Sequence, residues 1–206
     1  MTRQYSPHHA TWLNRPPPIA TPTQARWLTA PGALTARLRK LGPVTVRVTH
    51  EASEGATQDE ADALGLHTRA PVWVREVVLL VDGHPCVAAR SVTPLADSHA
   101  VWQAIRRLRS RPLADLLYHD RTIQRSSFAS AILQPAIPLH GVAQLAWATS
   151  AARDALRPRF LARRSIFVRA GRPLLVAEAF MPDFRRRGGV APTPSLPSLP
   201  ALPHAA

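Results

Sequence analysis

Two segments of the chain share one pattern, and this pattern constrains the fold more than any other feature. Residues 72–94 read VWVREVVLLV-DG-HPCVAARSVTP, and residues 163–182 read RRSIFVRAGRPLLVAEAFMP. In each segment a turn glycine is followed two residues later by proline, and another proline comes nine residues beyond that. Asp82-Gly83 is typical of a type I′ turn because glycine readily adopts positive φ. The sequence therefore predicts two long β-hairpins.

Arginines lie within the apolar strands of the first hairpin. If Val81 faces His84 across the turn, counting outward places Arg75 opposite Arg90. Directly opposed residues share one face of a sheet, so both arginines are predicted to lie among apolar neighbours. Two like charges cannot pair with each other, and a buried charge is costly without a partner. This arrangement suggests an anionic ligand, and the alternative is a different strand register in which Arg75 pairs with neighbouring side chains. The neighbours expected on the same face are Trp73, Val77 and Leu79.

The second hairpin places opposite charges across from each other. With a turn at Ala170-Gly171, Arg163 lies opposite Glu178, and Val176 and Phe180 flank the glutamate on its face. A cross-strand ion pair with a purely structural role explains Arg163 and Glu178 as well as a ligand site does. The residues alone leave both interpretations open.

The chain is long enough for one domain with a substantial core. Residues 1–23 and 185–206 are rich in proline and polar groups, which predicts a flexible leading segment and a disordered tail. The folded domain is expected between them, at 24–184. Helices are predicted at 33–41, from residue 97 or 98 to 109, at 112–117 and around 144–156, a strand at 44–48, and mainly loop at 51–70. Hairpins separated by helices indicate an α+β fold with a single antiparallel sheet, covered by helices and lid segments.

Charge and cysteine content limit the classes of partner. The formal net charge is +13, but Lys40 is the only lysine and the arginines are scattered along the sequence. No zinc-finger or RNP-type motif is present, so nucleic acid is not the expected partner, and a basic surface favours small anionic substrates. Cys86 is the single cysteine, which excludes an intramolecular disulfide and fits a reducing cytoplasm. Its place in a strand predicts that the side chain serves packing. No segment resembles a signal peptide or a membrane span.

Common catalytic motifs are missing from the sequence. There is no phosphate-binding loop, dinucleotide glycine fingerprint, serine elbow or metal-type histidine spacing. We therefore expect no metal and no organic cofactor. A reaction that depends on positioning and charge stabilisation is favoured over one that needs a dedicated nucleophile.

Five segments in order resemble the chorismate pyruvate-lyase family, whose members split chorismate into 4-hydroxybenzoate and pyruvate at the start of ubiquinone synthesis. They span most of the expected domain, and they read WLTAPGALTARL from Trp27, VWVREVVL from Val72, ARSVTP from Ala89, RPLADLL from Arg111 and LARRSIFVRAGRPLLVAEAFMP from Leu161. The resemblance implies a lyase with an α+β fold that acts as a monomer on a small molecule without a cofactor.

The resemblance also implies roles for particular residues. Arg75 corresponds to the arginine that binds the ring carboxylate, and Glu178 to the glutamate that binds the ring 4-hydroxyl. The backbones of Leu34 and Leu113 correspond to amides that help to hold the carboxylate. Arg90 corresponds to an arginine of a neighbouring strand and is the candidate for the second carboxylate of chorismate, on the enolpyruvyl group.

The chain departs from the family pattern in three places. Leu34 replaces a common methionine, the segment around 134–153 is longer than expected, and the proline-rich tail is an addition. The longer segment leaves open how the local lid is built.

An alternative of another class is a ligand-binding module without catalysis, because the same sheet serves as the effector domain of GntR-type regulators. Such regulators begin with a winged helix, and the residues before Val44 are too few to form one.

Overall fold

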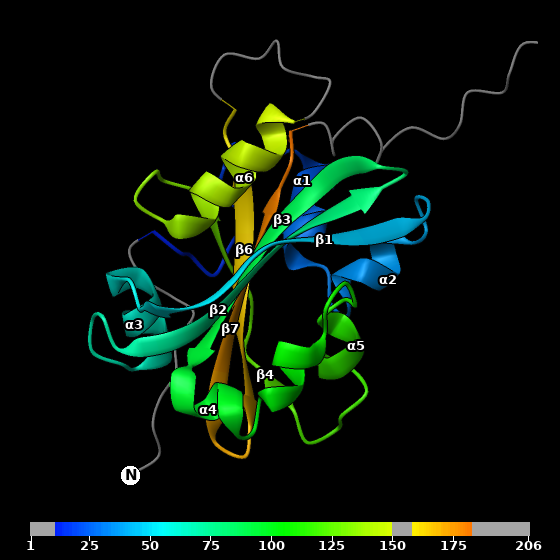
Figure 1. Cartoon of the computed structure of the whole chain (residues 1–206). Coiled ribbons are helices and arrows are strands. Elements are labelled where there is room, and N and C mark those ends of the chain that lie inside the picture. Colours follow the sequence, from blue (N-terminus) through cyan, green and yellow to red (C-terminus); the bar gives the residue numbers. More distant parts are fainter. Residues whose placement is uncertain (1–10, 150–157, 183–206) are drawn as a thin grey trace, which may run out of the picture.

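The computed structural model describes residues 11–149 and 158–182, and it contains one seven-stranded antiparallel sheet (Figure 1). The strands follow the order β1-β2-β3-β7-β6-β4, and β5 pairs with β6 beside β4. This architecture confirms the predicted α+β class. The strand bounds are β1 Val44–Gly55, β2 Pro71–Val81, β3 His84–Pro94, β4 Gln124–Arg125, β5 Ala129–Ile132, β6 Leu161–Arg169 and β7 Arg172–Phe180.

Helices cover both faces of the twisted sheet (Figure 1). On the face that carries Val77 and Val176, here called the site face, helices α1 and α2 pack at one end, and η1 and α5 at the other. Helix α4 lies next to η1 and contacts β2 and β3. Helices α3 and α6 pack on the opposite face. The helix bounds are α1 Pro22–Thr29, α2 Leu34–Leu38, α3 Gln58–Leu64, α4 Leu95–His99, η1 Gln103–Arg107, α5 Ala114–Leu117 and α6 Pro138–Ala148.

The register predicted for the second hairpin is confirmed. Ala170 and Gly171 form its turn with φ of 47° and 71°, and Arg163 faces Glu178. The first hairpin also turns as predicted, because Val81 pairs with His84.

The predicted opposition of Arg75 and Arg90 is wrong. The register shifts by one residue between Leu79 and Leu80, so that Arg75 faces Ser91 and Glu76 faces Arg90. The extra residue is Cys86, whose backbone carbonyl accepts a hydrogen bond from the Met181 amide at 2.9 Å. A bulge reverses the side-chain alternation beyond it, and Arg90 therefore points to the opposite face.

Strand β1 is longer than the sequence suggested. The residues from 51 to 55 continue the strand, whereas a loop was predicted there. A second bulge lies between Val48 and His50, and it places Glu51 opposite Arg75. A charged side chain is thereby added to the site face, where strict alternation would have turned it away.

The domain begins earlier than predicted. The indole of Trp12 is buried in the core beside α6, and Leu13 forms a β-bridge with Ser130. Helix α1 then begins at Pro22 with a capping box formed by Thr21 and Gln24. The prediction of a loosely attached segment is therefore wrong for residues 11–23. The predicted tail at 185–206 lies outside the described residues.

The predicted helices are shorter or displaced. The helix expected at 33–41 is the single turn and a half of α2, and the one expected to begin at 97 or 98 is divided into α4 and η1. Helix α6 begins at Pro138 rather than near Gln144, and it ends before residue 150, where the described residues stop. Inward-facing leucines were predicted better than helix bounds, since Leu34, Leu38, Leu108 and Leu117 are all buried.

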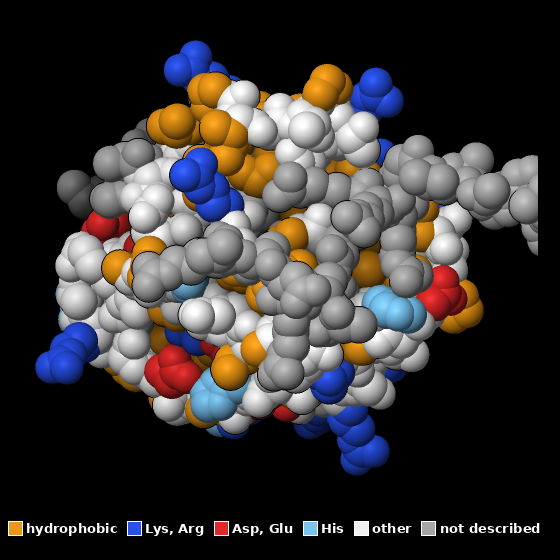
Figure 2. Space-filling model, turned by 90° about the horizontal axis from the view of Figure 1, so that it is seen from above, with side chains coloured by type: hydrophobic (Ala, Val, Ile, Leu, Met, Phe, Trp, Pro, Cys, Tyr) orange, Lys and Arg blue, Asp and Glu red, His pale blue; other side chains and the backbone are white. Residues whose placement is uncertain are grey.

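Lys and Arg side chains are spread around the face seen in Figure 2 and do not form a continuous patch there. This distribution agrees with the scatter of arginines along the sequence. In the described part of the chain, none of the helices is long and apolar enough to cross a membrane.

Candidate active site

A cavity of about 60 Å³ lies on the site face between the two groups of helices. Its floor is formed by β2, β3, β6 and β7. Two covering segments close over it: residues 30–38, which include α2, and residues 109–118, which include α5. Leu34 and Leu113 line the cavity from these segments, and Arg75 and Glu178 line it from the sheet. The structure thus brings these four predicted residues to one cavity.

Small side chains on β3 make room for this cavity. Ala89 lies between Val77 and Glu178, and Ser91 lies between Arg75 and Val176. A larger residue at position 89 or 91 would fill the space above the sheet. Arg75 on β2 and Glu178 on β7 are separated by β3, and the small side chains of β3 leave open space between them.

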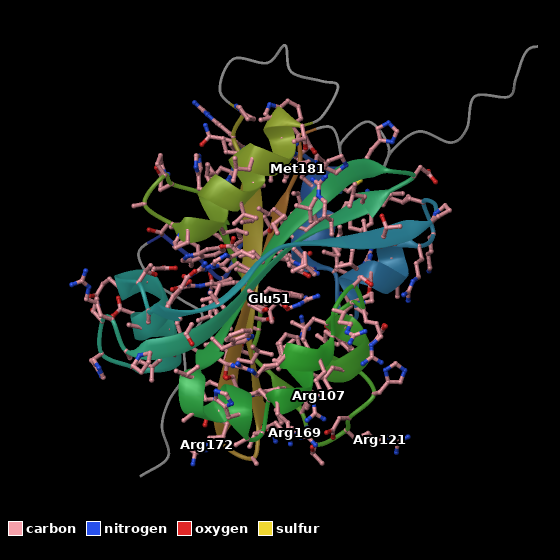
Figure 3. All side chains as sticks on the ribbon, viewed as in Figure 1. Glu51, Arg107, Arg121, Arg169, Arg172 and Met181 are labelled. Atoms are coloured by element: carbon pink, nitrogen blue, oxygen red, sulfur yellow. The ribbon has the colours of Figure 1, made fainter. Side chains whose placement is uncertain are left out.

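Arg75 is held at one end of the cavity by an acid and by backbone carbonyls. Its Nε donates to Glu51 Oε1 at 2.9 Å, and its Nη2 donates to the carbonyl of Arg109 at 2.7 Å. Figure 3 places Glu51 at the centre of the sheet. Burial lowers the pKa of Arg75, and Glu51 offsets part of this effect. Among the described residues Nη1 has no acceptor, so one edge of the guanidinium remains available to a carboxylate.

Glu178 is fixed at the other end by Arg163. The Nε of Arg163 donates to Glu178 Oε2 at 2.6 Å, and its Nη1 donates to the carbonyls of Trp27 and Ala30 at 3.0 Å each. Arg163 is 1% exposed, and it links the last hairpin to the start of the first covering segment. Its hydrogen bonds leave Glu178 Oε1 without a donor among the described residues.

The two covering segments are joined directly. The hydroxyl of Tyr118 donates to the carbonyl of Gly32 at 2.9 Å. Burial raises the pKa of Tyr118 and Glu178 adds to that effect, while the charges of Arg125 and Arg163 offset part of it. Neither Leu34 nor Leu113 uses its backbone amide as a donor within the described residues. Both amides are therefore available to a ligand.

Arg90 does not line this cavity. On the opposite face its three nitrogens donate to Glu60 at 2.7 Å, Glu76 at 2.6 Å and Glu54 at 3.0 Å. Burial lowers the pKa of Arg90, but the three glutamates raise it well above its usual value. Three carboxylates around one guanidinium repel a further anion. These contacts give Arg90 a structural role, because they tie it to β1, β2 and α3. They do not support the carboxylate-binding role that was expected for Arg90.

Some contributors to the site were missed from the sequence. Glu51 was assigned to a loop, and Tyr118 and Phe128 carried no recognisable pattern. The one sequence signal close to Tyr118 was the RPLADLL segment, which ends at the residue before it. Among the described residues, no cluster of three or more potential metal ligands is found.

The sequence model of the chorismate lyase family matches residues 6–189. The chain belongs to the chorismate lyase family. A probable chorismate pyruvate-lyase of Bordetella avium is 50% identical over 193 residues, which cover 91% of each chain. A probable chorismate pyruvate-lyase 1 of Burkholderia pseudomallei is 39% identical over 176 residues, covering 84% of this chain and 90% of the relative.

Solved structures with the same fold are more distant in sequence. The effector domain of PhnF from Mycobacterium smegmatis has a TM-score of 0.50 at 15% identity, covering 74% of this chain and 90% of that domain. A PhnF C-terminal domain has a TM-score of 0.52 at 18% identity, covering 71% and 87%. At this level of identity the similarity shows the fold alone.

The described part of the segment around 134–153, which was expected to be longer than the family pattern, does not line the cavity. Helix α6 lies within this segment and packs on β3 and β7 from the opposite face. This helix therefore belongs to the core of the chorismate lyase domain and not to the covering segments.

Proposed function

We propose that the protein is a chorismate pyruvate-lyase that converts chorismate into 4-hydroxybenzoate and pyruvate, the first step of ubiquinone synthesis. The observation that carries this proposal is the placement of Arg75 and Glu178 at two ends of one cavity with small residues between them. A ring with a carboxylate and a hydroxyl at opposite positions matches a cation at one end and an acceptor at the other. Family membership supports the same activity.

Arg75 binds the ring carboxylate with the guanidinium edge that Glu51 leaves available. The backbone amides of Leu34 and Leu113 add donors from the covering segments. Charge-assisted hydrogen bonds of this kind are stronger than neutral ones and fix orientation as well as affinity.

Glu178 accepts a hydrogen bond from the 4-hydroxyl of the ring through Oε1, because Arg163 occupies Oε2. In a cyclic pathway the hydrogen on ring carbon 4 passes to the methylene carbon of the enolpyruvyl group as the bond between carbon 3 and the ether oxygen breaks. Pyruvate leaves and the ring becomes aromatic, which supplies the driving force. The site contributes orientation and charge stabilisation, with no cofactor in this scheme.

The test is turnover of chorismate by the purified full chain without added metal or cofactor. We expect 4-hydroxybenzoate and pyruvate to appear in equal amounts when followed together by chromatography. Saturable binding of chorismate without products would contradict the proposal and favour the effector-type module that shares this fold.

Light scattering on the same sample tests the proposed monomer, and fractionation of producing cells tests the proposed cytoplasmic location.

A further inference from the structure

Arg125 is a partly buried cation beside the cavity, and it has no role in the reaction proposed above. It lies on β4 opposite Phe167, and Phe167 lines the cavity, so the two side chains share the site face. Its guanidinium carbon lies 4.0 Å from the centre of the Phe128 ring, which also lines the cavity. Arg125 therefore borders the site from the edge of the sheet.

The bonding of Arg125 is incomplete. Its Nη1 is buried and has no hydrogen-bond partner, and no carboxylate within the described residues forms an ion pair with it. Arg75 and Arg163 differ in this respect, since each pairs with a glutamate. A buried donor without an acceptor costs free energy comparable to a lost hydrogen bond. An anionic ligand would remove that cost.

Arg125 lies at the Glu178 end of the cavity. Arg163, which binds Glu178, is itself 4.2 Å from the centre of the Phe128 ring, so both guanidinium groups contact the same ring. The Tyr118 hydroxyl experiences the charges of Arg125, Glu178 and Arg163 together. These contacts place the unpaired cation near the acceptor for the 4-hydroxyl.

The chemistry of chorismate favours a cation at this end. Its ether oxygen is attached to carbon 3, next to the carbon that carries the 4-hydroxyl, and the enolpyruvyl group bears a second carboxylate. When the ring carboxylate is bound at Arg75 and the 4-hydroxyl at Glu178, the second carboxylate extends from the Glu178 end. Arg90, the residue expected to bind it, points to the other face of the sheet.

We propose that Arg125 binds the enolpyruvyl carboxylate of chorismate and so distinguishes the substrate from the product. This inference rests on the proposed lyase function. The product 4-hydroxybenzoate lacks this carboxylate, so Arg125 contributes to substrate binding and not to product binding. Pyruvate carries the same carboxylate away when it leaves.

The test compares substrate and product in an Arg125→Met variant, whose side chain still packs against Phe128. We expect kcat/KM for chorismate to fall by about 10- to 100-fold, as for loss of a charge-assisted hydrogen bond. The dissociation constant of 4-hydroxybenzoate, measured by calorimetry, should change by less than about twofold. Arg125→Lys keeps the charge but not the planar fork, and it should lie between the wild type and Arg125→Met.

Arg121→Gln is the matched control, because it removes the same charge from an exposed position in the same segment that points away from the sheet (Figure 3). It should leave both constants unchanged. Unaltered kcat/KM in Arg125→Met, or equal losses for chorismate and 4-hydroxybenzoate in both Arg125 variants, would overturn the proposal. If the wild type binds chorismate without turnover, the lyase function fails, and the dissociation constants of chorismate and 4-hydroxybenzoate still test Arg125.

Discussion

At the scale of single residues, the cost of burying charge drew attention to three positions in the strands, Arg75, Arg90 and Glu178. Arg75 and Glu178 stood out in the sequence because each interrupts an apolar strand, and both line the cavity. The same reasoning singled out Arg90, which is also buried but is satisfied by three glutamates on the other face. A buried charge in a sequence therefore predicts that a partner exists. It does not reveal whether the partner is a ligand or another side chain.

The role proposed for Arg75 predicts a loss of affinity for the ring carboxylate. In an Arg75→Met variant we expect the binding of 4-hydroxybenzoate to weaken by about 1.5–3 kcal/mol, or about 10- to 150-fold, because a charge-assisted hydrogen bond is lost. Calorimetry measures this change. Arg47→Met removes the same charge from an exposed position on β1 and should alter affinity by less than about twofold. Unchanged product affinity in Arg75→Met would refute the assignment.

At the scale of elements, two bulges decide which side chains face the cavity. The bulge at Cys86 turns Arg90 away and brings Ser91 to the site face, and the bulge before His50 brings Glu51 to it. Each inserts one residue into a pattern with a period of two, so every side chain beyond it changes face. The repeated hairpin pattern predicted both turns correctly, but it contained no signal for either bulge. The second hairpin has no bulge, which is why its register was predicted correctly.

The turn of the second hairpin allows a test of backbone geometry. Gly171 has φ of +71°, so Gly171→Ala should reduce the free energy of unfolding by about 1 kcal/mol, since alanine is strained in that conformation. The control is Gly141→Ala in α6, which meets no atom within 4 Å and has no positive φ. It should raise stability by up to about 1 kcal/mol through helix propensity. Urea denaturation measures both changes, and a stabilising Gly171→Ala would contradict the turn geometry.

At the scale of the whole molecule, distant segments complete both faces of the sheet. The covering segments meet through Tyr118 and Gly32, and the first of them is anchored to the last hairpin by Arg163. On the other face, Trp12 packs against α6, which lies far from it in the sequence. The site face and the opposite face therefore both depend on contacts between parts of the chain that are far apart in sequence.

The burial of Trp12 predicts that the leading segment stabilises the domain. Trp12 is 1% exposed, and truncating it to alanine should cost about 3–5 kcal/mol because a large cavity is created in the core. The adjacent Leu13 is 44% exposed, so Leu13→Ala should cost less than about 1 kcal/mol. Thermal and urea unfolding of the two variants measure the difference. Equal, small effects would show that the segment is not part of the core.

The sequence by itself determined the hairpins, the class of fold and the residues whose burial demands a partner, because turn chemistry and apolar alternation act over a few neighbouring positions. The RPLADLL and WLTAPGALTARL segments also marked the two covering segments through their resemblance to the family. Only the tertiary structure decided which charges share a cavity. Bulges, the packing of Trp12 and the approach of Arg163 to Phe128 depend on contacts between elements that are remote in the chain, and such contacts leave no local pattern in the sequence.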